Sequence, residues 1–417
     1  MNLKKRNGIK ITPILKLISK NRTIDRNGSA SWQGNTTKFE IESFLKTALF
    51  FEDRTMAFLE RVIQEAIVAE QNLEERKFFA HANKIANQLD QKKRKMKVVF
   101  PIWAGDTILS GNRKWKDVRI SFNVNPKSQF VRKAKEERVI QFEKRARDIG
   151  LEGWDFSDLP LAVCTVEAID SFDAFELAVK AISIELGLWS LSWYRGQYIV
   201  SSGAIDEPIN RILLAPYMTA HEISGSMTND VFWLNRWPNK LRQENPSQES
   251  IKIIRSTANS YRDGIHNLPK KWRKLAEQVL ARQYDAFSQV DLEASFLDGW
   301  RLLEAIGGNP REKSETLVKR AAWFFEDVEV KTQMGLHLMH RRNEISHGRP
   351  IEASDNEGLA FQMKEFVAPF LHAVLTNPFK FKTIEELWEF CDLPLDQEVR
   401  KRKLDHLERA ARFRKEK

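Results

Sequence analysis

Residues 268–308, LPKKWRKLAEQVLARQYDAFSQVDLEASFLDGWRLLEAIGG, decide the fold of the C-terminal part of this chain. Pro269 stands near a helix start, and the Gly307-Gly308 pair forms a helix stop. Between them, apolar residues recur every three or four positions, which is the period of an amphipathic helix. The residues of this stripe are Leu275, Val279, Phe287, Phe296, Trp300, Leu303 and Ile306. The stretch therefore predicts helical structure whose apolar face packs inside a bundle.

Further helices follow this stretch. SETLVKRAAWFFED (314–327) and VEVKTQMGLHLMHRRNEISHG (328–348) each have helical spacing, and Thr383 to Glu386 has the spacing of a capping box before a short last helix. Between them, another stripe contains Leu359, Met363, Phe366, Val367, Phe370 and Val374. Four to six helices with short connections predict a compact bundle.

The N-terminal part mixes helical and extended patterns. The residues from about 44 to 90 predict two antiparallel helices. MKVVFPIWA (96–104) and VRISFNV (118–124) predict strands around a turn formed by SGNRKWKD (110–117), and LAVCTVEAID (161–170) predicts another strand. SFDAFELAVKAISIELGL (171–188) then predicts a helix with Ser171 as its N-cap, and residues 192–237 predict more strands and loops. The fold class is thus α+β, with a mixed α/β domain followed by an all-α domain.

A Pro, Asn, Gln and Ser-rich segment, NRWPNKLRQENPSQES (235–250), has the composition of a linker. We therefore predict three parts. Residues 1–250 form a mixed α/β domain, for which we expect a sensing or regulatory role. Residues 251–390 form the helical bundle, and residues 391–417 form a basic tail helix.

Composition limits the class of protein. The chain has 42% hydrophobic residues in 417, and it offers neither a signal peptide nor the roughly 18 consecutive apolar residues of a membrane helix. We expect a cytoplasmic protein that does not associate with membranes. The two cysteines, Cys164 and Cys391, lie far apart without neighbouring Cys or His ligands, so we expect no disulfide framework, no metal site and no cofactor.

The charge points to a polyanionic partner. The net charge is +10, and residues 398–417 hold nine Lys or Arg against four Asp or Glu, which gives +5 in one short segment. A second cluster, QKKRKMK, spans residues 91–97. A third, RKAKEERVIQFEKRAR (132–147), alternates basic with acidic residues, which is typical of a solvated helix face.

The end of the helix predicted over 328–348 carries the chemically suggestive residues, HRRNEISHGRP (340–350). Met334, Leu338 and Ile345 mark its buried face, and Gly348 with Pro350 marks its end. His347 therefore stands in the last turn, where the helix dipole favours an imidazolium. Because Asn343 precedes it by four residues, the amide can hold one imidazole nitrogen. Arg342 lies about 140° around the helix from His347, within reach of its long side chain.

These residue types suit metal-free RNA cleavage. A histidine can take the proton from a 2′-hydroxyl, and an arginine can grip the phosphate and stabilise the charge that builds on its oxygens. One Arg and His pair supplies a single histidine, so a separate acid would come from a second copy across a two-fold axis. We therefore expect a homodimer that forms through the C-terminal bundle.

Two simpler interpretations stay open on spacing alone. Arginine and histidine are common in the last turn of ordinary helices because they complement the dipole. His337 and His340, at i and i+3, could present two ligands to a metal, but no third ligand completes such a site.

RRNEISHG (341–348) resembles the signature of HEPN domains, which is an arginine, a polar residue, a short spacer and a histidine. Arg342, Asn343 and His347 take these positions. In the ApeA-like branch of this superfamily, the motif follows a helix with an aromatic residue, a tryptophan and a Leu-Glu pair. FLDGWRLLEAIGG (296–308) matches that helix with Phe296, Trp300, Leu303 and Glu304. The resemblance covers about residues 267–376.

The resemblance implies an all-helical domain that dimerises so that two Arg and His pairs face one cleft, with metal-independent endoribonuclease activity. It implies catalytic roles for Arg342, Asn343 and His347, and it makes Glu304 a candidate anchor for Arg342. Arg341 and Arg349 are candidate RNA contacts. Such proteins serve in bacterial antiphage defence by abortive infection, or as toxins restrained by an antitoxin partner. The alternative is a member without catalysis that only binds nucleic acid or assembles with a partner.

Overall fold

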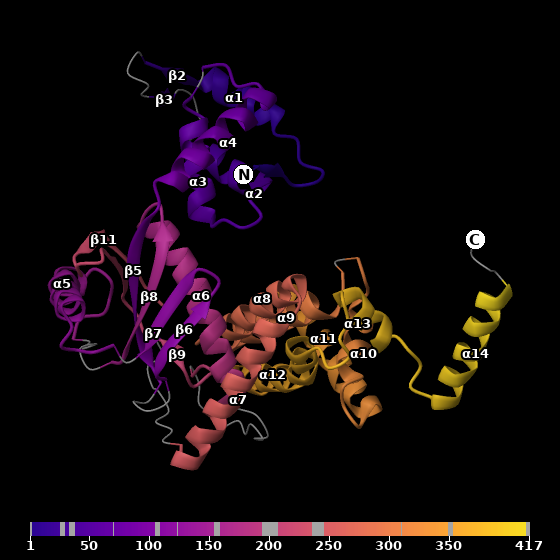
Figure 1. Ribbon diagram of the computed structural model, residues 1–417. Coiled ribbons are helices and arrows are strands. Elements are labelled where there is room, and N and C mark those ends of the chain that lie inside the picture. The colour runs from indigo at the N-terminus through magenta and orange to yellow at the C-terminus, as the bar shows by residue number, and fades with distance from the viewer. Residues whose placement is uncertain are drawn as a thin grey trace. The chain divides into compact units, whose positions relative to one another are not determined.

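The computed structural model describes residues 2–25, 30–32, 38–69, 71–104, 109–122, 124–153, 159–193, 207–235, 246–309, 311–348 and 353–413. It divides into two compact units (Figure 1). The first comprises residues 1–182 and 214–235, and the second comprises residues 183–213 and 236–417. The predicted domains had placed residues 183–213 in the first part. Helix α6 contributes residues to both units.

The first unit begins with a helical region that has its own hydrophobic core. Short strands accompany its helices. Its elements are β1 (Lys4–Lys5), α1 (Thr12–Asn21), β2 (Arg22–Ile24), β3 (Ala30–Trp32), α2 (Lys38–Ala48), β4 (Leu49–Phe50), α3 (Met56–Ala66) and α4 (Glu75–Gln91). Helices α3 and α4 pack against each other, in the segment where the sequence predicts two helices.

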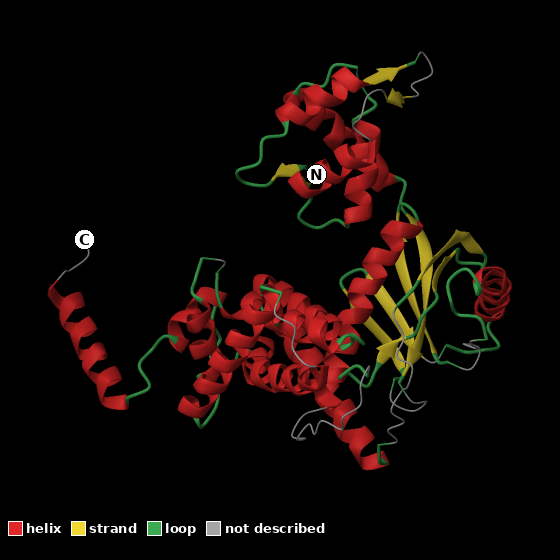
Figure 2. Ribbon diagram, turned by 180° about the vertical axis from the view of Figure 1, so that it is seen from behind, coloured by secondary structure: helices red, strands yellow, loops and turns green. Residues whose placement is uncertain are grey.

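The rest of the first unit is an antiparallel sheet in the order β11-β10-β5-β8-β7-β6, with β9 paired to β5. Helices cover both faces (Figure 2). On one face, α5 packs through Val131 and Ala134 against Val99 and Val163. On the other, Phe175 of α6 stacks on Trp233 at 4.0 Å between ring centroids. The elements are β5 (Arg94–Trp103), β6 (Gly111–Trp115), β7 (Val118–Phe122), α5 (Gln129–Arg145), β8 (Leu161–Ala168), α6 (Ser171–Trp193), β9 (Leu213–Leu214), β10 (Met218–His221) and β11 (Met227–Trp233).

Two local predictions in this sheet region are wrong. Most of SGNRKWKD is not a turn, because Gly111–Trp115 forms strand β6 and only Lys116 and Asp117 turn the chain. The N-cap of α6 is Asp170 instead of Ser171. The Asp170 carboxylate accepts hydrogen bonds from the backbone N–H groups of Phe172 and Asp173, both at 3.0 Å, which satisfies two donors that the helix leaves open.

The second unit is the helical bundle that the sequence predicts (Figure 1). Helix α9 packs against both α8 and α12, and α11 packs against α10. The predicted stripe of α9 is buried, as is the whole predicted stripe of α12. The elements are α7 (Gln248–Asn267), α8 (Lys270–Phe287), α9 (Leu292–Gly307), α10 (Ser314–Ala322), α11 (Val328–Ser346), α12 (Ala353–Thr376), α13 (Ile384–Cys391) and α14 (Gln397–Phe413).

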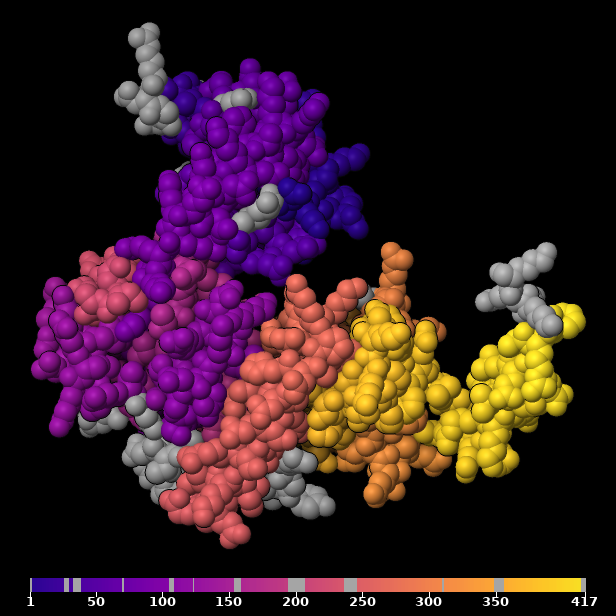
Figure 3. All heavy atoms as spheres, in the orientation of Figure 1, coloured from indigo at the N-terminus to yellow at the C-terminus, as the bar shows by residue number. Residues whose placement is uncertain are grey.

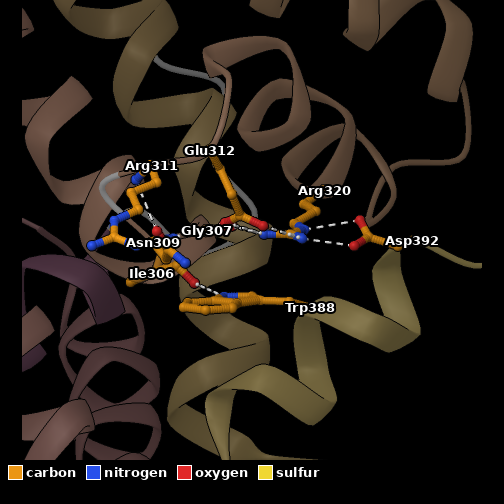
Figure 4. A network of polar contacts seen from close by, with 8 residues as sticks. All are labelled: Ile306, Gly307, Asn309, Arg311, Glu312, Arg320, Trp388 and Asp392. Carbon is orange, nitrogen blue, oxygen red and sulfur yellow. Dashed lines mark hydrogen bonds and ion pairs between the residues drawn. The ribbon is translucent and has the colours of Figure 1, made fainter.

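Arg320 of α10 ties the end of α9 to α13 (Figure 4). Its guanidinium is almost completely buried and donates to Glu312 at 3.0 Å, to Asp392 at 2.6 Å and to the Gly307 carbonyl at 2.7 Å. The hydrogen bond from Arg320 lowers the pKa of the Glu312 carboxyl. A buried arginine needs such partners, so this network fixes the three segments together.

Helix α11 approaches its neighbours most closely at Gly335. A Cβ atom placed there would lie 2.5 Å from the Phe366 ring and 2.6 Å from a Val318 methyl group. Only glycine therefore lets α11 contact α10 and α12 at this level. This contact holds the helix that carries the candidate site.

We predict that Gly335→Ala lowers the free energy of unfolding by about 1–2 kcal/mol, because overpacking outweighs the gain in helix propensity. Gly358→Ala is the matched control, since a Cβ atom there meets nothing within 4 Å. It raises stability by about 0.5–1 kcal/mol. Urea titration measures the free energy of unfolding of both variants. Equal changes of the same sign would contradict the close approach at Gly335.

A buried chain of hydrogen bonds links α5 to β10. Arg138 donates to Thr219 at 2.7 Å, the Thr219 hydroxyl lies 2.9 Å from Nε2 of His221, and Nδ1 of His221 lies 2.8 Å from the Gly225 carbonyl. Because a carbonyl only accepts, the proton sits on Nδ1 and Nε2 accepts from the hydroxyl. Arg138 is thus buried, so the prediction of a fully solvated face for residues 132–147 is wrong at this position.

Burial, together with the charge of Arg138, lowers the pKa of His221 from 6.5 to about 4. The unfolded chain therefore takes up this proton first as the pH falls, and stability is lost from about pH 6.5 downward. We predict that, between about pH 7 and pH 5, the free energy of unfolding falls by about 2 kcal/mol more in the wild type than in His221→Gln. Urea unfolding of the first unit at the two pH values measures this, and parallel losses would refute it.

Candidate functional site

The candidate site lies at the C-terminal end of α11. The helix ends at Ser346, and His347 is its C-cap, with its backbone N–H donating to the carbonyls of Asn343 and Glu344 at 3.1 Å each. Gly348 follows with a φ of +75°, in the left-handed region that favours glycine. The helix therefore ends where the sequence predicts, and His347 is exposed there.

A contact between α9 and α11 holds Arg342. Its Nη2 donates to Oε1 of Glu304 at 3.0 Å, and the same oxygen accepts from the indole N–H of Trp300 at 2.8 Å. The guanidinium carbon lies 5.8 Å from the centre of the Trp300 ring, which is within the range of a cation–π contact. The structure thus brings Arg342 and Glu304, 38 residues apart in the sequence, into the contact that the resemblance implied.

Asn343 makes a different contact from the one predicted. Its Oδ1 accepts from Nη1 of Arg342 at 3.1 Å, whereas only its backbone carbonyl contacts His347. Within the described ranges, the imidazole of His347 has no hydrogen-bond partner. Among the described residues, the Asn343 amide makes no hydrogen bond to the imidazole and its oxygen accepts from Arg342, so the predicted orienting role of Asn343 stays a prediction.

Side chains around the site remain accessible. The side chains of Arg342 and Glu304 are 32% and 38% exposed. In this helix, only Gly335 and Leu338 are buried, while the predicted core residues Met334 and Ile345 are half-buried. The site therefore faces solvent in a single chain, and it does not lie in the bundle core.

The other candidate residues are placed as follows. Arg341 forms an ion pair with Glu344 at 3.0 Å, and His340 lies 3.5 Å from the same carboxylate. Glu344 was not predicted as a site residue, although its spacing of three and four residues from these side chains could have indicated the contact. Arg349 lies outside the described residues. Nowhere in the described ranges do three His, Cys, Asp or Glu side chains gather as a metal would require.

The arrangement can bind and polarise an anion. A guanidinium has five N–H donors, and Glu304 and Asn343 occupy only two of those on Arg342. An exposed imidazole, that of His347, lies at the same helix end. This pairs a phosphate-binding group with an imidazole, a side chain that can act as a general acid or base.

Comparison with known proteins gives no match, since neither a family model nor a curated protein nor a solved structure matches the chain. In the described parts, no helix has the length and apolar character that crossing a bilayer requires.

Proposed function

We propose that this protein is a metal-independent endoribonuclease of the HEPN type that acts as a homodimer in the cytoplasm. The main support is the chain of contacts from Trp300 through Glu304 to Arg342 and Asn343, which holds a partly exposed guanidinium beside the helix end that carries His347. The similarity of RRNEISHG to the HEPN signature supports RNA as the substrate.

Arg342 binds the phosphate in this proposal. The hydrogen bond to Glu304 and the contact with Trp300 restrict its rotation, so less entropy is lost when the guanidinium binds a phosphate. Its remaining N–H donors then stabilise the negative charge that grows on the non-bridging oxygens. Glu304 is a positioning residue, because it acts through Arg342.

His347 transfers the proton. It takes the proton of the 2′-hydroxyl while that oxygen forms a bond to phosphorus, and the bond from phosphorus to the 5′-oxygen breaks. The products are a 2′,3′-cyclic phosphate and a 5′-hydroxyl end. The leaving 5′-oxygen needs a proton, which His347 of the partner subunit supplies across the two-fold axis.

The resemblance also supports a biological setting. We place the protein in bacterial antiphage defence by abortive infection, or in a toxin and antitoxin pair. The first unit then senses a trigger or a partner, and the basic clusters of the chain favour RNA over an uncharged substrate.

We predict that purified protein cleaves single-stranded RNA in EDTA and that His347→Ala slows cleavage about 100- to 10,000-fold. The variant keeps its thermal stability because His347 is exposed. Gel analysis of labelled RNA measures the rate, and circular dichroism measures the stability.

His340→Ala is the matched control, since it removes an exposed histidine from the same helix and leaves cleavage unchanged. Cleavage that survives His347→Ala would overturn the proposal. RNA that is bound but never cut, with salt-dependent binding that Arg342→Ala weakens, would identify a non-catalytic binding protein instead.

A further inference from the structure

A groove of about 630 Å³ lies at the other end of α11. Its walls come from α10, the first turns of α11 and the segment after α13. Several apolar side chains of these walls are solvent-exposed, with Val330 at 66%, Leu393 at 41% and Leu395 at 52%. Three apolar residues that share one groove and stay exposed are unusual for a monomer.

Helix α14 has apolar residues that nothing covers. None of its residues is buried, and its atoms form the yellow end of the chain in Figure 3. Leu404, Leu407 and Phe413 are 58%, 68% and 89% exposed. Leu404 and Leu407 are three residues apart and therefore lie on one face of the helix. A helix this exposed gains its stability from packing against a partner surface.

The first turn of α14 is fixed to the segment that precedes it. The Asp396 carboxylate caps the helix through the N–H of Val399 at 2.9 Å. Arg400 donates to the carbonyls of Pro394 and Leu395 at 2.8 and 2.7 Å. Leu395 itself lines the groove, so α14 would have to break these bonds to turn back into the groove of its own chain.

The charges of the helix and the groove are opposite. Residues 397–413 hold six Lys or Arg and three Asp or Glu, which gives α14 a net charge of +3. Glu329 and Asp392 line the groove together with Lys319, and Glu326 and Asp327 stand directly before α11. Opposite charges around an apolar contact favour this pairing and set its orientation.

We propose that α14 of a second copy of this chain occupies the groove, so that two chains exchange their C-terminal helices around a two-fold axis. Leu404 and Leu407 pack against Val330 and Leu393, and the basic side of α14 faces the acidic start of α11. Each chain supplies one helix and one groove, which makes the contact self-complementary and closed. This inference does not rest on the ribonuclease chemistry, because it needs no RNA.

Sedimentation analysis of the full chain over a range of concentrations tests the exchange. Leu404→Gln with Leu407→Gln keeps the charge of α14 and raises the dimer dissociation constant at least about 100-fold. Asp405→Gln changes the same part of α14 on the side away from these leucines and leaves the protein dimeric. A wild type that stays monomeric, or a leucine variant as dimeric as wild type, would overturn the proposal.

A crosslink between two different chains shows whose helix fills the groove. Chains with Val330→Cys and differently tagged chains with Leu407→Cys are mixed and treated with a short bifunctional maleimide. We expect a covalent heterodimer, and we expect at least several-fold less of it when Asp405→Cys, on the opposite side of the helix, replaces Leu407→Cys. A doubly substituted chain that crosslinks only within itself would show that α14 folds back, and the proposal would be wrong. If the variant with Leu404→Gln and Leu407→Gln loses RNA binding but stays dimeric, α14 has a nucleic-acid role and the proposal is wrong.

Discussion

The buried indole of Trp300 determines the geometry of the candidate site, because its N–H must find a hydrogen-bond acceptor inside the bundle. Glu304, one turn further along α9, provides that acceptor at 2.8 Å. A carboxylate that lies near the bundle surface is stabilised by a cation, and Arg342 of α11 supplies it at 3.0 Å. One core residue thus sets the position of a carboxylate, and the carboxylate sets the position of the arginine that would bind phosphate.

The two ends of helix α11 contribute to two different surfaces of the protein. Gly335 brings its middle against Phe366 and Val318, while both of its ends include exposed or half-buried side chains. The C-terminal end carries Arg342 and His347, and the N-terminal end forms the apolar groove. In the proposals made above, a second chain covers both of these surfaces. The second histidine that the proposed reaction requires and the exposed groove are two separate arguments for the proposed dimer.

The sequence predicts the parts of this fold in which one periodic signal dominates. The stripes of α9 and α12, the end of α11 at Gly348 and the strands β5, β7 and β8 follow from apolar spacing and from glycine. Strand β6 escaped prediction because GNRKW has one large apolar residue and forms a strand only through its pairing with β7. The burial of Arg138 and the contact between Asn343 and Arg342 depend on partners that local spacing does not reveal. The contact between Glu304 and Arg342 was expected from the resemblance and not from local spacing, and the packing of α9 on α11 forms it.

The chemistry of the RNA ends tests the central claim most directly. The measurement is mass spectrometry of the products that the full-length protein forms in EDTA, with a matched RNA in which the nucleotide at the cut carries no 2′-hydroxyl. If His347 activates the 2′-hydroxyl, we expect 2′,3′-cyclic phosphate and 5′-hydroxyl ends, and no cut in the 2′-deoxy substrate. Cleavage of the 2′-deoxy substrate, or products with 5′-phosphate ends, would contradict the proposed roles of His347 and Arg342.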